Sequence, residues 1–347
     1  MRHQNNFDLI RLFAAGQVMV IHSIEWLDLP AHPYLLWAIG PFQGVAIFFV
    51  VSGFLVSGSL MAPGKTLGAY FAARALRIYP ALWVNLAALL GLIYLGGNLA
   101  LDPASDTFWN WASVAFSSGS DWVANGAVAP VFQTGGFYEA FPSGVLWTIP
   151  VELSFYLILP FILSPIVPRW LSIAIWGSAS VWVFFEYTYD EAPIFIGRYL
   201  WVFLFGVALR VYWPHVRPFI EGKAWFWLPA FIIGCYVTAK TGPAYYFNSA
   251  SWVNIAMTAL LSLAVISCAF TLKSAASVLK GNDISYGLYL WHMPVIWTLR
   301  EMGLGGHWVA GAVAYIAAAV IAALSWHLIE KPALGLKARG RTLPSQP

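Results

Sequence analysis

The chain has 347 residues, of which 60% are hydrophobic, 17% are aromatic and only 10% are charged, and its mean hydropathy is +0.71. In an ordinary soluble domain about 25% of the residues are charged, so this composition excludes a soluble globular protein and a disordered chain. The two cysteines are too few for a disulfide scaffold, and a net charge of +3 gives no reason to expect nucleic acid as a partner. The class that remains is a polytopic membrane protein.

Apolar runs long enough to cross a bilayer recur along the whole chain. A spanning helix needs about 20 mostly apolar residues, and the first such run has no signal-peptide cleavage site before Asp28, so we expect it to be retained. We predict an all-α polytopic membrane protein of about ten spans, with one transmembrane domain over residues 1–335 and a short cytoplasmic tail over residues 336–347. The expected spans lie near residues 9–26, 41–61, 79–97, 145–164, 170–186, 193–212, 225–240, 252–271, 284–300 and 308–329.

The distribution of Lys and Arg predicts the orientation. Cytoplasmic loops carry an excess of these residues, and with the N-terminus inside only Arg198, Lys240 and Arg300 fall on outer segments. We therefore expect both termini in the cytoplasm. The longest break, residues 98–144, becomes an outer loop rich in Trp, Gly, Ser and Asp, whose tryptophans either anchor it at the membrane interface or contact a substrate.

Ionisable residues fall inside several predicted spans, where they are costly to bury. On the first span Arg11 and His22 are eleven residues apart, which places them on nearly the same helix face and about 16 Å apart along its axis. Arg11 would lie at the cytoplasmic boundary and His22 deep in the membrane. Both are candidate functional residues; the structural alternatives are a charge anchor for Arg11 and a packed histidine for His22.

Three other spans place polar residues at a depth similar to that of His22. With a rise of about 1.5 Å per residue, Ser52, Glu152 and His292 fall in one central band with it. A carboxylate beside a histidine orients the ring and stabilises its charged form. We therefore expect a polar chamber between helices, and structural pairing is the alternative for Glu152 and His292.

Two arginines mark the predicted inner mouth of the third span. Arg74 and Arg77 are three residues apart and share one helix face. Two guanidinium groups at the inner membrane surface suit a phosphate-bearing ligand. An anionic lipid is the other ligand with this chemistry.

Several segments, taken in order, resemble the acyltransferase 3 family of integral membrane O-acyltransferases. The similarity covers essentially the whole chain. The segments are FDLIRLFAAGQVMVIH (7–22) with its Arg-x10-His pattern, AIFFVVSGFLVSGSL (46–60), RALRIYPALW (74–83), LWTIPVELSFYLILP (146–160), SYGLYLWHMPV (285–295) and the closing IEKP (329–332).

The resemblance implies a reaction. Members move an acyl group, usually acetyl, from cytoplasmic acyl-CoA to a hydroxyl of an extracytoplasmic or lipid-linked acceptor, usually a carbohydrate, and the usual setting is a bacterial inner membrane. It implies that His22 is the catalytic histidine, with Arg11 and Glu152 as further catalytic residues. Whether His22 acts as a general base or itself carries the acyl group is open. No metal is implied.

The resemblance also implies binding residues. Arg74 and Arg77 would bind the CoA phosphates, and Ser52 and Gly53 of the SGFL segment would lie where the acyl donor binds. In the segment over residues 285–295, Tyr289 and His292 would contact substrate. The acceptor and the oligomeric state are not predicted.

Two other classes of protein compete with the enzyme. A transporter of a sugar or small molecule explains the buried His and Glu side chains, but it does not explain the arginine pair beside the Arg-x10-His span. A structural or assembly subunit would have no use for polar groups converging at one depth, because they are costly to bury.

Overall fold

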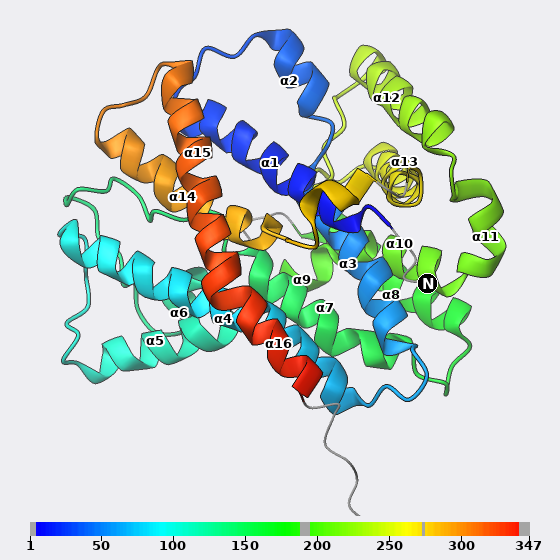
Figure 1. The fold of residues 1–347 in the computed structure, drawn as a ribbon, viewed down its shortest axis with the longest axis horizontal. Helices are drawn as coiled ribbons and strands as arrows, with labels where there is room; N and C mark the ends of the chain where they lie inside the picture. The colour runs from blue at the N-terminus through cyan, green and yellow to red at the C-terminus, as the bar shows by residue number, and fades with distance from the viewer. Residues whose placement is uncertain (1–4, 188–194, 273–274, 340–347) are drawn as a thin grey trace, which may run out of the picture. The chain divides into compact units, whose positions relative to one another are not determined.

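The computed structural model describes residues 5–187, 195–272 and 275–339. Helices form nearly all of its regular structure (Figure 1), and within these ranges no strand occurs beyond an isolated bridge between Leu99 and Phe132. Each predicted apolar run overlaps at least one helix. The predicted all-α class is therefore confirmed.

In the described part of the chain, five helical stretches are long and apolar enough to cross a membrane. The shorter apolar helices Thr148–Ile162 and Leu200–Val211 coincide with further predicted spans. The count of ten spans, the cytoplasmic termini and the division at residue 335 stay predictions, and residues 340–347 of the predicted tail lie outside the described residues. The five stretches are Phe7–Trp26, Pro33–Leu60, Leu67–Leu95, Trp252–Ala269 and Trp308–Leu336.

The chain divides into two compact units, the first of which comprises Met1–Gln17, Pro33–Leu67 and Val151–Asp283. Its helices are α1 (Phe7–Trp26, which continues into the second unit), α2 (Pro33–Ile39), α3 (Gly44–Leu60), α7 (Thr148–Ile162, whose first residues belong to the second unit), α8 (Arg169–Glu186), α9 (Phe195–Arg198), α10 (Leu200–Val211), α11 (Trp213–Ile220), α12 (Ala224–Thr241), α13 (Trp252–Ala269) and the 3-10 helix η1 (Ala275–Leu279). Within this unit α3 packs against α10 and α13, and α12 packs against α13 (Figure 1).

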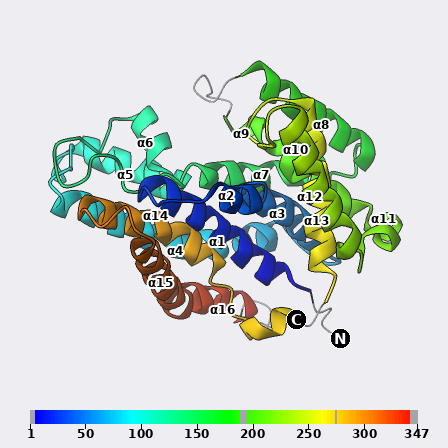
Figure 2. The same cartoon turned by 90° about the horizontal axis from the view of Figure 1, so that it is seen from above.

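The second unit comprises Val18–His32, Gly68–Pro150 and Ile284–Pro347. Its further helices are α4 (Leu67–Leu95), α5 (Asp106–Ser118), α6 (Asp121–Ala127), α14 (Ser285–Glu301), α15 (Trp308–Ser325), the π-helix η2 (Trp326–Glu330) and α16 (Lys331–Arg339). Within this unit α14 and α15 lie side by side (Figure 1 and Figure 2).

Two glycines bring the backbones of α3 and α10 into direct contact. A Cβ added at Gly53 would overlap the carbonyl oxygen of Phe203, and one added at Gly206 would overlap the carbonyl oxygen of Val50. Small residues are what allow helices to approach this closely in a membrane protein. Gly53 of the SGFL segment is therefore a helix-packing residue, and its predicted part in donor binding stays a prediction.

The predicted outer loop contains two helices with an apolar core of their own. α5 begins after Ser105, whose side chain accepts a hydrogen bond from the Phe108 amide, and ends at Gly119 in the left-handed conformation (φ +82°). Trp111 is buried in the core that α5 and α6 share, and its indole N–H donates to Asn125 at 2.7 Å. This segment is thus a folded element and not a plain connector.

The tryptophans of this segment divide into two kinds. Trp111 is explained by packing, whereas Trp109 and Trp122 are 64% and 54% exposed. The two exposed rings are the ones that fit either of the predicted roles, as interface anchors or as substrate contacts.

Asp121, at the start of α6, is a buried carboxyl in the same segment. Burial raises the pKa of this side chain to about 7, although the backbone N–H groups of Asp121 and Trp122 donate to it and oppose the rise.

Replacing Gly206 with alanine tests the contact between α3 and α10. Gly206→Ala should destabilise the protein by about 1–3 kcal/mol, because the backbone that meets the new methyl group cannot rotate away. Gly91→Ala is the matched control, since Gly91 also lies inside a helix but a Cβ there meets nothing within 4 Å. Thermal unfolding of both purified variants in one detergent makes the comparison, and equal Tm values would contradict the close contact.

The pKa of Asp121 predicts a pH dependence of the α5–α6 segment. The folded segment holds a proton that the unfolded one releases near pH 3.8, so its stability should fall as the pH rises from about 4 to about 7. Asp121→Asn should remove most of this dependence and leave the segment better protected at pH 8. Amide hydrogen exchange, corrected for the intrinsic rate, measures the effect, with Asp106→Asn at an exposed carboxyl as control. A flat wild-type profile would refute the prediction.

Candidate active site

His22 on α1 and His292 on α14 form a hydrogen-bonded pair of imidazoles. Nδ1 of His22 lies 3.0 Å from Nε2 of His292, and the two rings stack with centroids 5.2 Å apart and planes 23° apart. His292 is fully buried, whereas His22 is half-buried. The predicted polar residues of these two helices are therefore brought together, and the group that orients His22 is a second imidazole.

The partners of His292 fix the proton positions of the neutral pair. Nδ1 of His292 lies 3.1 Å from the carbonyl oxygen of Leu288, and a carbonyl only accepts, so this nitrogen carries the proton. Nε2 of His292 then has a lone pair and accepts from Nδ1–H of His22. It follows that Nε2 of His22 carries the other lone pair, and this atom makes no hydrogen bond to any described residue.

Tyr289 lies one turn before His292 and contacts its ring, with centroids 5.9 Å apart. The Tyr289 hydroxyl lies 3.0 Å from Oγ1 of Thr148 and donates to the Val145 carbonyl at 3.3 Å. Tyr289 and His292 are both buried and bonded to protein groups. These contacts suit a role for Tyr289 and His292 in positioning the His22 ring. Their predicted contacts with substrate stay predictions.

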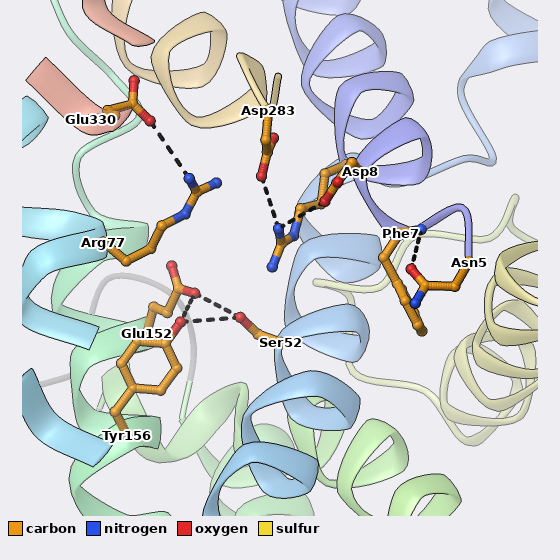
Figure 3. A network of polar contacts seen from close by, with 10 residues as sticks. Asn5, Phe7, Asp8, Ser52, Arg77, Glu152, Tyr156, Asp283 and Glu330 are labelled. Carbon is orange, nitrogen blue, oxygen red and sulfur yellow. Dashed lines mark hydrogen bonds and ion pairs between the residues drawn. The ribbon is translucent and has the colours of Figure 1, made fainter. Parts of the chain in front are cut away.

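Glu152 on α7 and Ser52 on α3 meet in a second polar cluster, within the first unit. Oε1 of Glu152 accepts a hydrogen bond from the Ser52 hydroxyl at 2.7 Å and another from the Tyr156 hydroxyl (Figure 3). The two hydroxyl oxygens are 3.2 Å apart. Two hydrogen bonds to one carboxylate oxygen fix the orientation of the Glu152 side chain.

Tyr156 is not among the residues predicted from the sequence. A signal for it exists, because Tyr156 follows Glu152 by four residues in VELSFY, and residues at this spacing are neighbours on a helix surface. Ser52 and Glu152, which the sequence places only at a similar depth, are in direct contact in the structure.

Arg11 is held by carboxylates near the start of α1. Its guanidinium lies 2.9 Å from Asp283 and 3.7 Å from Asp8. The pair with Asp283 ties α1 to the segment that precedes α14, which is the behaviour of an anchor. A catalytic part for Arg11 stays a prediction. Asp283 was not predicted, since nothing local connects two residues so far apart in the chain.

Arg77 on α4 has a buried partner in the closing IEKP segment. Its guanidinium lies 3.7 Å from Glu330, which is only 2% exposed (Figure 3), and 5.8 Å from the centre of the Tyr286 ring. Glu330 also accepts from the Ser325 hydroxyl at 3.1 Å. Glu330 ends a π-helix, a local deviation often found at functional sites, and Arg74 lies one turn before Arg77 on α4.

The described residues hold no group of three or more His, Cys, Asp or Glu side chains that could bind a metal ion. The chemistry offered by the described clusters is that of imidazole, carboxylate, hydroxyl and guanidinium groups.

The His22 imidazole has a lone pair on Nε2 and lies on an apolar helix, an arrangement that is compatible with proton transfer. Residues 4–327 match the family model described as Acyltransferase domain. The chain therefore belongs to the acyltransferase 3 family, and it is an acyltransferase.

Curated relatives agree with this family. The chain is 36% identical to "Nodulation protein 10" of Rhizobium leguminosarum bv. viciae, over 96% of this chain and 94% of the relative. It is 25% identical to an "O-acetyl transferase" of Shigella phage Sf6, over 95% and 96%. It is 24% identical to the "Putative peptidoglycan O-acetyltransferase YrhL" of Bacillus subtilis (strain 168), over 95% of this chain but only 55% of that relative. No solved structure matches the chain.

Removing the Tyr156 hydroxyl tests the cluster around Glu152. Tyr156→Phe takes one of two donors from a carboxylate oxygen and should lower the free energy of unfolding by about 1–3 kcal/mol. Tyr315→Phe, at an exposed tyrosine of α15, is the control and should leave stability unchanged. Thermal unfolding in detergent measures both variants, and a Tyr156→Phe protein as stable as the control would show that the hydroxyl is not needed by Glu152.

Proposed function

We propose that this protein is a membrane O-acyltransferase that moves an acyl group, expected to be acetyl, from cytoplasmic acyl-CoA to a hydroxyl of a carbohydrate or glycolipid acceptor on the extracytoplasmic side. The observation that carries the proposal is the direction of the His22 lone pair. Membership of an acyltransferase family supplies the reaction, and Nε2 of His22 is a nitrogen held ready to take a proton.

In the proposed reaction Nε2 of His22 takes the proton of the acceptor hydroxyl as the hydroxyl oxygen attacks the thioester carbonyl. The carbon–sulfur bond then breaks, and the proton on Nε2 passes to the sulfur, so that the products are the ester and CoA as its free thiol. His22 is transiently an imidazolium, and His292 stabilises it by accepting from Nδ1–H. An acyl-imidazole route would use the same lone pair, and trapping of an acylated His22 separates the two routes.

The other predicted catalytic and binding residues keep their proposed roles. Arg11, fixed by Asp283, and Glu152, fixed by Ser52 and Tyr156, complete the proposed catalytic set. We assign the pyrophosphate of CoA to Arg74 and Arg77, and the buried Glu330 pairs with Arg77. An anionic lipid remains the competing ligand of this pair.

The proposed acceptor is a sugar, free or lipid-linked. One relative is described as a putative peptidoglycan O-acetyltransferase, and the glycan strands of peptidoglycan lie outside the cytoplasmic membrane. The exposed rings of Trp109 and Trp122 in the α5–α6 segment offer flat surfaces on which a sugar ring stacks. A bacterial inner membrane is the proposed location, since it gives access to CoA on one side and to glycans on the other.

Replacing His22 tests the reaction and the role of the pair together. His22→Ala should reduce acyl transfer by roughly 100- to 10,000-fold, the usual worth of a general base, and His292→Ala should reduce it by a smaller factor, because it removes orientation and not the base. Mass spectrometry of surface glycans and glycolipids from expressing cells detects the acyl increment, and His307→Ala at an exposed histidine is the control.

Each outcome of this experiment has a distinct meaning. An increment that persists at the wild-type level in His22→Ala would remove the histidine from the mechanism and leave the enzyme. If wild type gives no increment, and the purified protein is stabilised by sugars but not by CoA, the transporter interpretation replaces the proposal.

A further inference from the structure

The first unit contains a pocket of about 440 Å³ that none of the predicted site residues lines. It is formed where the start of α1, the second half of α3, the end of α10, α11 and the end of α13 meet. The Lys and Arg pattern predicts that each of these ends lies on the cytoplasmic side. Pockets of this size are typical of sites for small molecules and cofactors.

Aromatic rings form one wall of the pocket. The rings of Trp213 and Phe270 lie with centroids 4.7 Å apart and planes 33° apart, and Phe54 meets Trp213 edge to face at 5.3 Å. Trp213 and Phe270 are half-buried, so parts of their faces remain available. Flat aromatic surfaces of this kind bind a planar ring by stacking.

An arginine provides the positive charge of the pocket. The Arg210 guanidinium lies 5.5 Å from the centre of the Phe54 ring, and among the described residues no carboxylate lies within ion-pair distance of it. Gly58 makes room for this side chain, since a Cβ there would lie 2.5 Å from Nε of Arg210. Arg217 also lines the pocket but is paired with Glu221, so Arg210 is the cation left for an anionic ligand.

We propose that this pocket binds the 3′-phosphoadenosine end of the acyl-CoA donor, with the adenine against Trp213 and Phe270 and the 3′-phosphate on Arg210. The inference rests on the proposed function, because it assigns one end of that donor. An aromatic wall beside an arginine without a carboxylate partner matches a planar base that carries a phosphate. An anionic phospholipid has the phosphate but no ring to use the wall.

The 3′-phosphate allows a sharp binding test with the purified full-length protein. Wild type should bind CoA more tightly than dephospho-CoA, which lacks only this phosphate. Arg210→Met should weaken CoA binding by roughly 10- to 100-fold and abolish the difference between the two ligands. Gly58→Ala, which displaces the Arg210 side chain without removing its charge, should act in the same direction. Arg169→Met, at an exposed arginine of α8, is the control.

Three results would overturn the inference. Acyl transfer and CoA binding that are unaffected by Arg210→Met and Gly58→Ala would leave the proposed function standing and remove the pocket from it. A loss that is equal for CoA and dephospho-CoA would exclude the 3′-phosphate. Stabilisation by phosphatidylglycerol in mixed detergent micelles that depends on Arg210, without stabilisation by adenosine 3′,5′-bisphosphate, would make the pocket a lipid site. Wild-type protein that neither binds CoA nor transfers acyl groups would instead refute the proposed function itself.

Discussion

A polar side chain inside a bilayer finds no water to satisfy its hydrogen bonds, so the chain itself must supply a partner. The described structure meets this requirement at the buried groups that the sequence marks. His22 has His292, Glu152 has two hydroxyl donors, Arg11 has Asp283 and Arg77 has Glu330. Of the residues in these contacts only Asp283 lies outside the segments that resemble the family. The motifs are therefore best understood as partners of one another, joined by contacts between segments that are far apart in the chain.

Helix packing and a polar contact fall on adjacent residues of one motif. In the SGFL segment Ser52 donates to Glu152, while the adjacent Gly53 brings the backbone of α3 against that of α10. A larger residue at Gly53 would separate the two helices, and with them the elements that form the pocket around Arg210. Gly53 thus supports the pocket through the position of α3 against α10, without lining it.

Periodicity and composition predicted the helices and the polar candidates because both are local properties. Each apolar run overlaps a helix, and depth along the helices places Ser52 and Glu152 at a similar level, although it does not specify their contact. The partners Asp283 and Glu330 were not anticipated, since a single sequence holds no signal for a contact across hundreds of residues. Residues 98–144 were interpreted as a loop because their apolar residues occur in runs too short to resemble a span. In the structure these runs form short helices that pack around Trp111 in a small separate core.

A pair of neutral imidazoles also has a property that a histidine–carboxylate pair lacks. A carboxylate would attract a proton to His22 and hold it there as a charge, whereas an imidazole partner only accepts Nδ1–H. In the proposed reaction the pair then stays neutral until the acceptor hydroxyl gives up its proton. The Leu288 carbonyl is what prevents His292 from presenting the opposite tautomer. A backbone group of α14 thereby determines which nitrogen of His22 on α1 is available as the proposed base. The helical hydrogen-bond pattern that makes α14 stable in a membrane is, at this carbonyl, also part of the proposed chemistry.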